Sequence, residues 1–158
     1  MSDTFAPASA CLTGGCQCGA VRYVLTAQPT NRNICHCRMC QKASGGPFMA
    51  FGGVRLSELV ITSGAIATFS SSDIAKRGFC ARCGTPLTYE GVGSDHISVT
   101  LGSLDDPGAV EPRTQLGIES RVSWLIRSLS LPEIRTEQWL AKKRIAAVHN
   151  HQHPDHQT

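Results

Sequence analysis

Aromatic side chains, long apolar runs and an excess of one charge are all scarce in this sequence of 158 residues. It has five Phe, two Trp and two Tyr, and its charged residues make up 17% of the chain with a formal net charge of only +3. Such a small charge gives no argument for a nucleic-acid partner. No stretch approaches the roughly 18 apolar residues that a membrane-spanning helix needs, so we expect no association with a membrane.

The first ten residues lack the features of an export signal. They carry Asp3, contain no basic residue and are not followed by an apolar stretch. We therefore expect residues 1–10 to form a flexible leader and the protein to be cytoplasmic. In a reducing compartment, the eight cysteines of the chain favour metal binding or reactive thiols over disulfide bonds.

Short segments in which apolar and polar residues alternate, separated by Gly, Pro and Ser, predict a mainly β domain. Strands are expected over residues 21–25, 48–54, 59–61, 67–70 and 76–79. Residues 87–89 and 97–101 flank a Gly-Val-Gly turn and predict a hairpin. These short strands indicate a sheet sandwich or barrel rather than βαβ units.

Only the end of the chain predicts a helix. Thr136 begins a segment running to Val148, with Glu137 near its start and basic residues later, as the helix dipole favours. We take residues 11–139 as one domain and residues 140–158 as the helix end followed by a His-rich, disordered tail. The histidines of this tail are expected to bind metal only adventitiously.

Seven of the eight cysteines fall into three short groups, and two of these groups form sulfur pairs. A C-x-x-C turn directs two sulfurs to one side, and the glycine that follows, here Gly84, allows the positive φ that such a turn needs. Zinc takes about four such ligands at tetrahedral corners. The two pairs therefore predict a closed, structural zinc site, which ties distant parts of the chain together. Its ligands are Cys16, Cys18, Cys80 and Cys83.

The third group, Cys35, Cys37 and Cys40, predicts a different kind of site. Three protein ligands around one metal leave a fourth position open, which is how catalytic zinc sites are built. We interpret these cysteines as the ligands of a second, open zinc and as the candidate catalytic site. The alternative is a closed site, completed by His36 or Cys11.

The charge of such a site favours thiol chemistry. Zinc with three thiolates carries a formal charge of −1, so it is a weaker Lewis acid than zinc held by three neutral histidines. Activation of water is therefore disfavoured, whereas binding of a further thiol beside a carbonyl group is favoured. Arg32, Arg38 and Lys42 are candidates to receive a carboxylate or an oxyanion.

Three segments of the chain carry a family resemblance: GGCQCGAVRY at 14–23, CHCRMCQKASG at 35–45 and FCARCGTPL at 79–87. Together with Trp124 and Leu131-Pro132, they resemble the glutathione-dependent formaldehyde-activating enzyme family, also called the centromere-protein-V/GFA domain. The resemblance covers about residues 12–132. It implies a mainly β fold described as a β-tent, two Zn²⁺ per chain and the same division of the cysteines into four and three ligands.

The activity implied by the resemblance is a carbon–sulfur lyase reaction that reversibly joins glutathione to formaldehyde as S-hydroxymethylglutathione. We interpret the chain as a zinc-dependent, lyase-type protein that adds a small, glutathione-like thiol to a formaldehyde-like aldehyde. The alternative is a non-catalytic zinc-binding module that recognises protein or nucleic acid. The basic residues are dispersed, with no run longer than Lys142-Lys143-Arg144, which is evidence against nucleic acid.

Overall fold

The computed structural model describes residues 11–158, and the fold is mainly β, as the sequence predicts. The leader expected at residues 1–10 lies outside the described residues. A three-stranded sheet contains, in spatial order, β1 (Leu12–Gly15), β2 (Arg22–Leu25) and β5 (Leu59–Ser63). A seven-stranded sheet has the order β10 (Thr114–Leu116), β3 (Asn31–Cys35), β4 (Met49–Arg55), β9 (His96–Thr100), β8 (Pro86–Gly91), β7 (Ala75–Phe79) and β6 (Ala67–Ser72).

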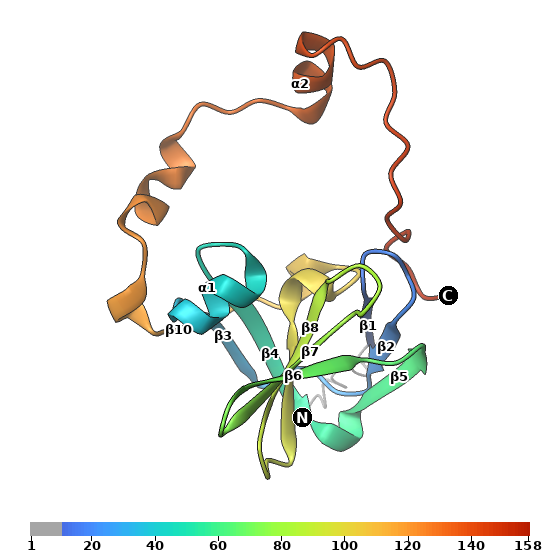
Figure 1. The fold of residues 1–158 in the computed structure, drawn as a ribbon, viewed down its shortest axis with the longest axis vertical. Helices are drawn as coiled ribbons and strands as arrows, with labels where there is room; N and C mark the ends of the chain where they lie inside the picture. The colour runs from blue at the N-terminus through green and yellow to red at the C-terminus, as the bar shows by residue number, and fades with distance from the viewer. Residues whose placement is uncertain (1–10) are drawn as a thin grey trace, which may run out of the picture.

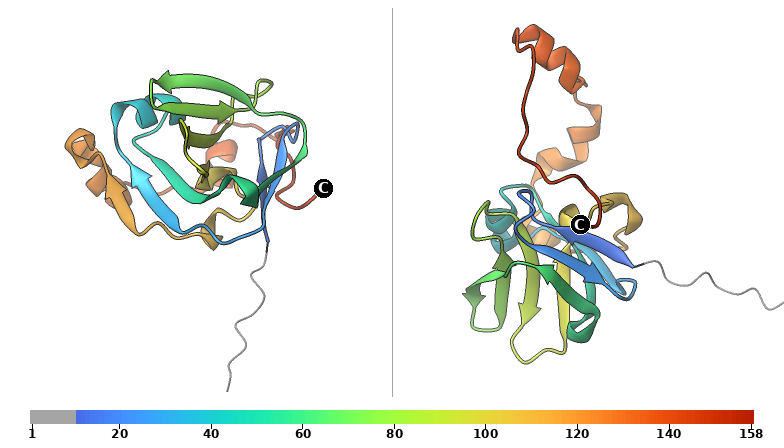
Figure 2. Two further views of the ribbon diagram at one scale, coloured as in Figure 1. Left: turned by 90° about the horizontal axis from the view of Figure 1, so that it is seen from below. Right: turned by 90° about the vertical axis from the view of Figure 1, so that its right-hand side faces the viewer.

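The strands pair antiparallel, except that β10 lies parallel to β3. The expected hairpin is confirmed, because β8 pairs antiparallel with β9 across the glycine-rich turn. The larger sheet curls so that both sheets surround one interior (Figures 1 and 2). The helices are α1 (Arg38–Ser44) and α2 (Thr136–Lys142), with 3-10 turns η1 (Leu56–Glu58), η2 (Leu101–Ser103), η3 (Pro107–Ala109), η4 (Ile118–Ser120) and η5 (Ser123–Ser130).

The C-terminal helix is present but shorter than expected, since α2 ends at Lys142 rather than near Val148. Helix α1 was not predicted. It follows β3 directly, its N-cap is Cys37, whose sulfur accepts from the Cys40 N–H, and it ends at Gly45 with φ of 68°. Among residues 11–158, no helix is long and apolar enough to cross a membrane.

The buried apolar residues form two clusters, and each of the two cysteine groups belongs to a different cluster. The larger cluster lies between the two sheets, where Tyr23 and Leu87 are fully buried, and it includes Cys16 and Cys80. The smaller cluster is formed by Cys40, Met49 and Phe51, with Cys35, Cys37 and Tyr89 packed against it. The four-cysteine group is therefore part of the main core, whereas the three-cysteine group lies in a separate pocket of the larger sheet.

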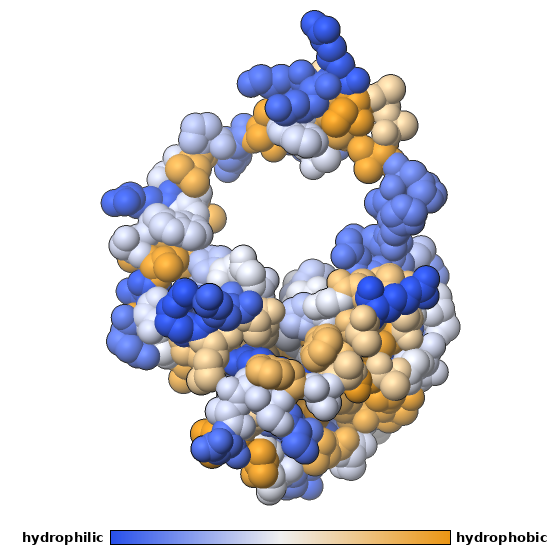
Figure 3. All heavy atoms as spheres, viewed as in Figure 1, coloured by the Kyte–Doolittle hydropathy of each residue, from blue (hydrophilic) through white to orange (hydrophobic). Residues whose placement is uncertain are grey.

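Residues 118–149 leave the two sheets as an extended arm that carries η4, η5 and α2 (Figure 1). Large apolar side chains on it face solvent, including Trp124, Ile126 and Leu129, the last of which is 93% exposed. With all atoms drawn, the arm and the body surround an opening, and apolar residues are spread along the arm (Figure 3).

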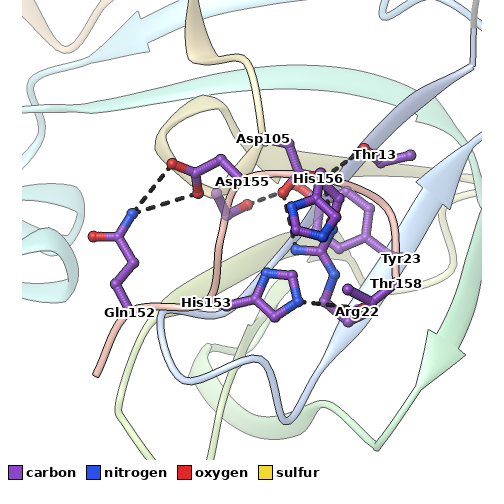
Figure 4. Close-up of polar contacts among 10 residues, drawn as sticks. Thr13, Arg22, Tyr23, Asp105, Gln152, His153, Asp155, His156 and Thr158 are labelled. Atoms are coloured by element: carbon purple, nitrogen blue, oxygen red, sulfur yellow. Dashed lines mark hydrogen bonds and ion pairs between the residues drawn. The ribbon is translucent and has the colours of Figure 1, made fainter. Parts of the chain in front are cut away.

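The end of the chain then returns to the domain. Residues 150–158 contain no helix or strand, and two backbone groups of this segment form hydrogen bonds with the domain. The His153 N–H donates to the Gln17 carbonyl at 2.7 Å, and Arg22 donates to the His156 carbonyl at 2.9 Å. The buried Arg22 and the partly buried Asp105 form a two-pronged ion pair at 2.9 and 2.5 Å next to this contact (Figure 4). Burial would raise the pKa of Asp105, but its bonds from Arg22 and Thr13 outweigh this and lower it.

Candidate metal centres

The structure brings the four sulfurs of Cys16, Cys18, Cys80 and Cys83 within 4.8 Å of one another. Cys16 Sγ lies 3.6 Å from Cys18 Sγ, which in turn lies 3.9 Å from Cys80 Sγ. A Zn–S bond of about 2.3 Å places sulfurs at tetrahedral corners about 3.8 Å apart. The observed spacing therefore fits one tetrahedral metal ion of this size.

Two similar backbone turns hold these sulfurs. The N–H of Cys16 donates to the Val21 carbonyl at 2.9 Å, and the N–H of Cys80 donates to the Thr85 carbonyl at 3.0 Å, so in each turn the acceptor lies five positions after the donor. Gly84 has φ of 79°, which confirms the backbone conformation expected at this position. The turns connect β1 with β2 and β7 with β8, so a shared metal would join the two sheets.

Thr85 links the two turns, which the sequence motifs do not reveal. Its hydroxyl accepts from the Gln17 N–H at 3.0 Å and donates to Cys83 Sγ at 3.2 Å. Burial raises the pKa of the Cys83 thiol, but the hydrogen bonds from Thr85, together with those from Cys18, outweigh burial and bring the pKa to about 6. For Cys16 burial dominates and raises the pKa to about 12, despite a hydrogen bond from the Val21 N–H.

The structure also brings the sulfurs of Cys35, Cys37 and Cys40 within 4.8 Å of one another. Cys35 is the last residue of β3, and the other two lie at the N-cap and in the first turn of α1. Burial raises the pKa of the Cys37 thiol, but the hydrogen bonds from Cys40, together with those from Cys35 and Met39, outweigh burial and lower the pKa. For Cys40 burial dominates, and it raises the pKa to about 12 although Arg77 acts against it.

These three cysteines lie on the wall of a cavity of about 210 Å³, formed against one face of the larger sheet. Within the part of the chain that the structure describes, no histidine, carboxylate or fourth cysteine joins the three sulfurs. His36 lies outside the group: it is buried, and its Nε2 donates to Gln115 Oε1 at 2.9 Å. Three thiols in a pocket reached from solvent fit a soft or borderline metal such as zinc with one position left for a ligand.

Arg77 is the site residue that the sequence did not reveal. It extends from β7, is 8% exposed, and donates from one guanidinium nitrogen to Cys40 Sγ at 3.3 Å. Its guanidinium carbon lies 5.1 Å from the centroid of the Tyr89 ring. This positive charge lies against one of the three sulfurs and would offset the negative charge of three thiolates around a divalent ion.

The basic residues singled out from the sequence lie elsewhere. Arg32, Arg38 and Lys42 do not line the cavity. Arg38 donates to the Gln41 side chain, and with Lys42 it borders a separate surface depression beside Trp124. The structure therefore gives these residues no contact with a ligand held at the three sulfurs.

We expect the Arg77→Met substitution to weaken metal binding at the three-cysteine group by about 10- to 100-fold, because a positive neighbour of the ligands is lost. The affinity is measured by competition with a chromophoric chelator. Lys76→Met is the matched control, since it removes the same charge from the adjacent position of β7, where the side chain is exposed. Equal affinities for the two variants would show that Arg77 does not support the metal.

Comparisons with known proteins indicate the family to which the chain is similar. A family model described as glutathione-dependent formaldehyde-activating enzyme (GFA) matches residues 11–120. A Halomonas elongata protein named as a candidate enzyme of this type is 28% identical over an alignment of 124 positions, which covers 72% of this chain and 79% of that protein. An uncharacterised lyase of Schizosaccharomyces pombe is 32% identical over 76 residues, which are 48% of this chain and 55% of that protein. The chain thus matches about half the length of this second relative.

Among solved structures, a Rhodobacter sphaeroides protein aligns with a TM-score of 0.47 and 22% sequence identity. The alignment covers 65% of this chain and 98% of that one.

Proposed function

The chain belongs to the glutathione-dependent formaldehyde-activating enzyme (GFA) family, and from this premise we propose that it is a zinc-dependent, carbon–sulfur lyase-type protein. In this proposal Cys35, Cys37 and Cys40 hold the zinc at which a small thiol is added reversibly to an aldehyde. The observation that carries the proposal is the position of these three sulfurs on the wall of a cavity, apart from the four sulfurs in the main core.

Zinc bound there would supply one coordination position for the sulfur of a visiting thiol and would lower the pKa of that thiol. The protein itself provides the surroundings. Arg77 places a positive charge beside Cys40, and the contacting rings of Tyr89 and Phe51 form part of the cavity wall. In the addition, the thiol sulfur bonds to the carbonyl carbon, and the thiol proton is transferred to the carbonyl oxygen. The product is a hemithioacetal, with no oxidation or reduction.

The second part of the proposal concerns the other four cysteines. Cys16, Cys18, Cys80 and Cys83 would hold a structural zinc, because four thiolates complete its coordination and leave no position for a substrate. All eight cysteines of the chain are free thiols in the structure. We place the protein in the cytoplasm, where a reducing environment keeps such thiols available for metal.

The test is exchange NMR on the full chain loaded with two equivalents of zinc. We expect the protein to speed hemithioacetal formation from formaldehyde and at least one thiol of a panel that includes glutathione and 2-mercaptoethanol. The reference is the same mixture with free zinc and without protein, because the reaction also proceeds unaided. Rates equal to this reference for every thiol would contradict the proposed function.

A further inference from the structure

The wall of the three-cysteine cavity is nearly free of charge. Among the described residues that line it, Arg77 is the one charged side chain, and no Asp, Glu, Lys or His takes part. The other polar groups are neutral: the amides of Asn31 and Asn33 and the hydroxyls of serines such as Ser72 and Ser98. Such a wall can form hydrogen bonds with a ligand, but it offers little to balance a charge that the ligand brings in.

Strand geometry explains this lack of charge. Alternate residues of a strand face opposite sides of the sheet. In β3 the residues Asn31, Asn33 and Cys35 line the cavity, whereas Arg32 between them does not. In β7 Arg77 lines the cavity, whereas its basic neighbour Lys76 does not. The basic residues of both strands are thus directed away from the ligand space, apart from Arg77.

The guanidinium group of Arg77 already has contacts within the protein. One of its terminal nitrogens donates to Cys40 Sγ at 3.3 Å, and the other lies 3.9 Å from Met49 Sδ. Its third nitrogen, Nε, has no hydrogen-bond partner but is fully buried, so a carboxylate in the cavity cannot reach it. Three thiolates around a divalent ion carry a formal charge of −1, so the single positive charge of Arg77 would bring the loaded site to about neutrality and leave no excess positive charge for a carboxylate.

The size of the cavity adds a second restriction. At about 210 Å³ it is smaller than the roughly 300 Å³ at which pockets for drug-sized ligands begin. A tripeptide such as glutathione is a ligand of that larger class. It also carries two carboxylates and an ammonium group, and burying a charge without a partner is strongly unfavourable.

We propose that the thiol handled at this site is small and uncharged, carrying at most a hydroxyl or amide group besides its sulfur. This inference rests on the proposed thiol addition and specifies its substrate. The neutral amides and hydroxyls of the wall bind the polar end of such a thiol, while Phe51 and Tyr89 pack against its carbon atoms. Glutathione and other carboxylate-bearing thiols bind weakly, because their charge loses water and gains no partner.

The experiment measures thiol binding without turnover. The full chain is loaded with Co²⁺, and the change in its visible absorption on thiol addition gives a dissociation constant. Cys37→Ser protein serves as the blank, because only its four-cysteine group is expected to bind cobalt. The probes are 2-mercaptoethanol and mercaptoacetate, which have similar size and differ in charge, together with glutathione. We expect mercaptoacetate and glutathione to bind at least about tenfold more weakly than 2-mercaptoethanol.

A positive charge placed on the cavity wall should weaken the preference for the uncharged thiol. Ser72→Lys puts an ammonium group at a half-buried wall position of β6, so the difference between mercaptoacetate and 2-mercaptoethanol should narrow. Ser63→Lys is the matched control, because it adds the same charge at an exposed position of β5 that does not line the cavity. With this control variant the difference should remain as in the wild type.

The outcomes separate the two proposals. If glutathione or mercaptoacetate binds the wild type as tightly as 2-mercaptoethanol, the restriction to uncharged thiols is wrong while thiol binding at the three cysteines stands. If Ser72→Lys and Ser63→Lys change the ratio of the two dissociation constants equally, the charge of the cavity wall does not determine the preference for uncharged thiols. If no thiol changes the spectrum, the proposed thiol addition fails, and this inference fails with it.

Discussion

Replacing Cys83 by serine is expected to unfold the domain. The four-cysteine group lies in the main core and joins the turn between β1 and β2 to the turn between β7 and β8. A serine hydroxyl stays protonated near neutral pH and does not replace a thiolate ligand of zinc. The cross-link closes the long loop between the turn at Cys16 and Cys18 and the turn at Cys80 and Cys83. Its loss lowers the free energy of unfolding by about 4 kcal/mol on the estimate used for disulfides. Most of a typical stability of about 5–15 kcal/mol would then be gone, because the free energy of metal binding is lost as well.

The measurement is thermal unfolding followed by circular dichroism, with the zinc content determined on the same samples. Cys11→Ser is the control, because Cys11 is exposed and belongs to neither cysteine group. We expect the control to melt like the wild type with two zinc ions and Cys83→Ser to show no cooperative transition at room temperature or above. A Cys83→Ser protein that melts like the control would mean that the four sulfurs do not stabilise the fold.

The cysteine groups could be located from the sequence because their geometry is local. Two cysteines within a single tight turn direct their sulfurs to one side wherever that turn lies in the fold. The turn at Gly84 has the positive φ that its sequence requires. Strands with clear alternation, such as those of the β8–β9 hairpin, were also predicted for a local reason.

Features that depend on distant parts of the chain could not be predicted in this way. Helix α1 has seven residues, too few to show a helical period, and its cap is a cysteine rather than one of the usual capping residues. Strand β10 forms only by pairing with β3, from which it is far removed in sequence. In the sequence, Lys76 and Arg77 are adjacent basic residues of the kind usually exposed to solvent. Only the curl of the sheet brings Arg77 into contact with Cys40.

Replacing Cys37 by serine should have the opposite outcome to Cys83→Ser. The three-cysteine group packs with the small cluster around Met49 and Phe51 and lies outside the main core. Serine at this position also keeps an oxygen that can accept the Cys40 N–H, since Cys37 is the N-cap of α1 and serine is a preferred residue there. We therefore expect a folded protein with a melting temperature close to that of the wild type.

The functional loss should nevertheless be complete. With two sulfurs remaining, the second metal site no longer has the three ligands that an open zinc site needs, so one equivalent of zinc should be lost. Exchange NMR with formaldehyde and thiol should then give the rate of the protein-free reference. The zinc content is measured beside that of Cys83→Ser. The structure places the two cysteine groups in separate clusters. If Cys37→Ser loses one zinc ion and stays folded while Cys83→Ser unfolds, the two groups have different roles. A Cys37→Ser protein that unfolds, or that retains both zinc ions and the exchange activity, would contradict that division.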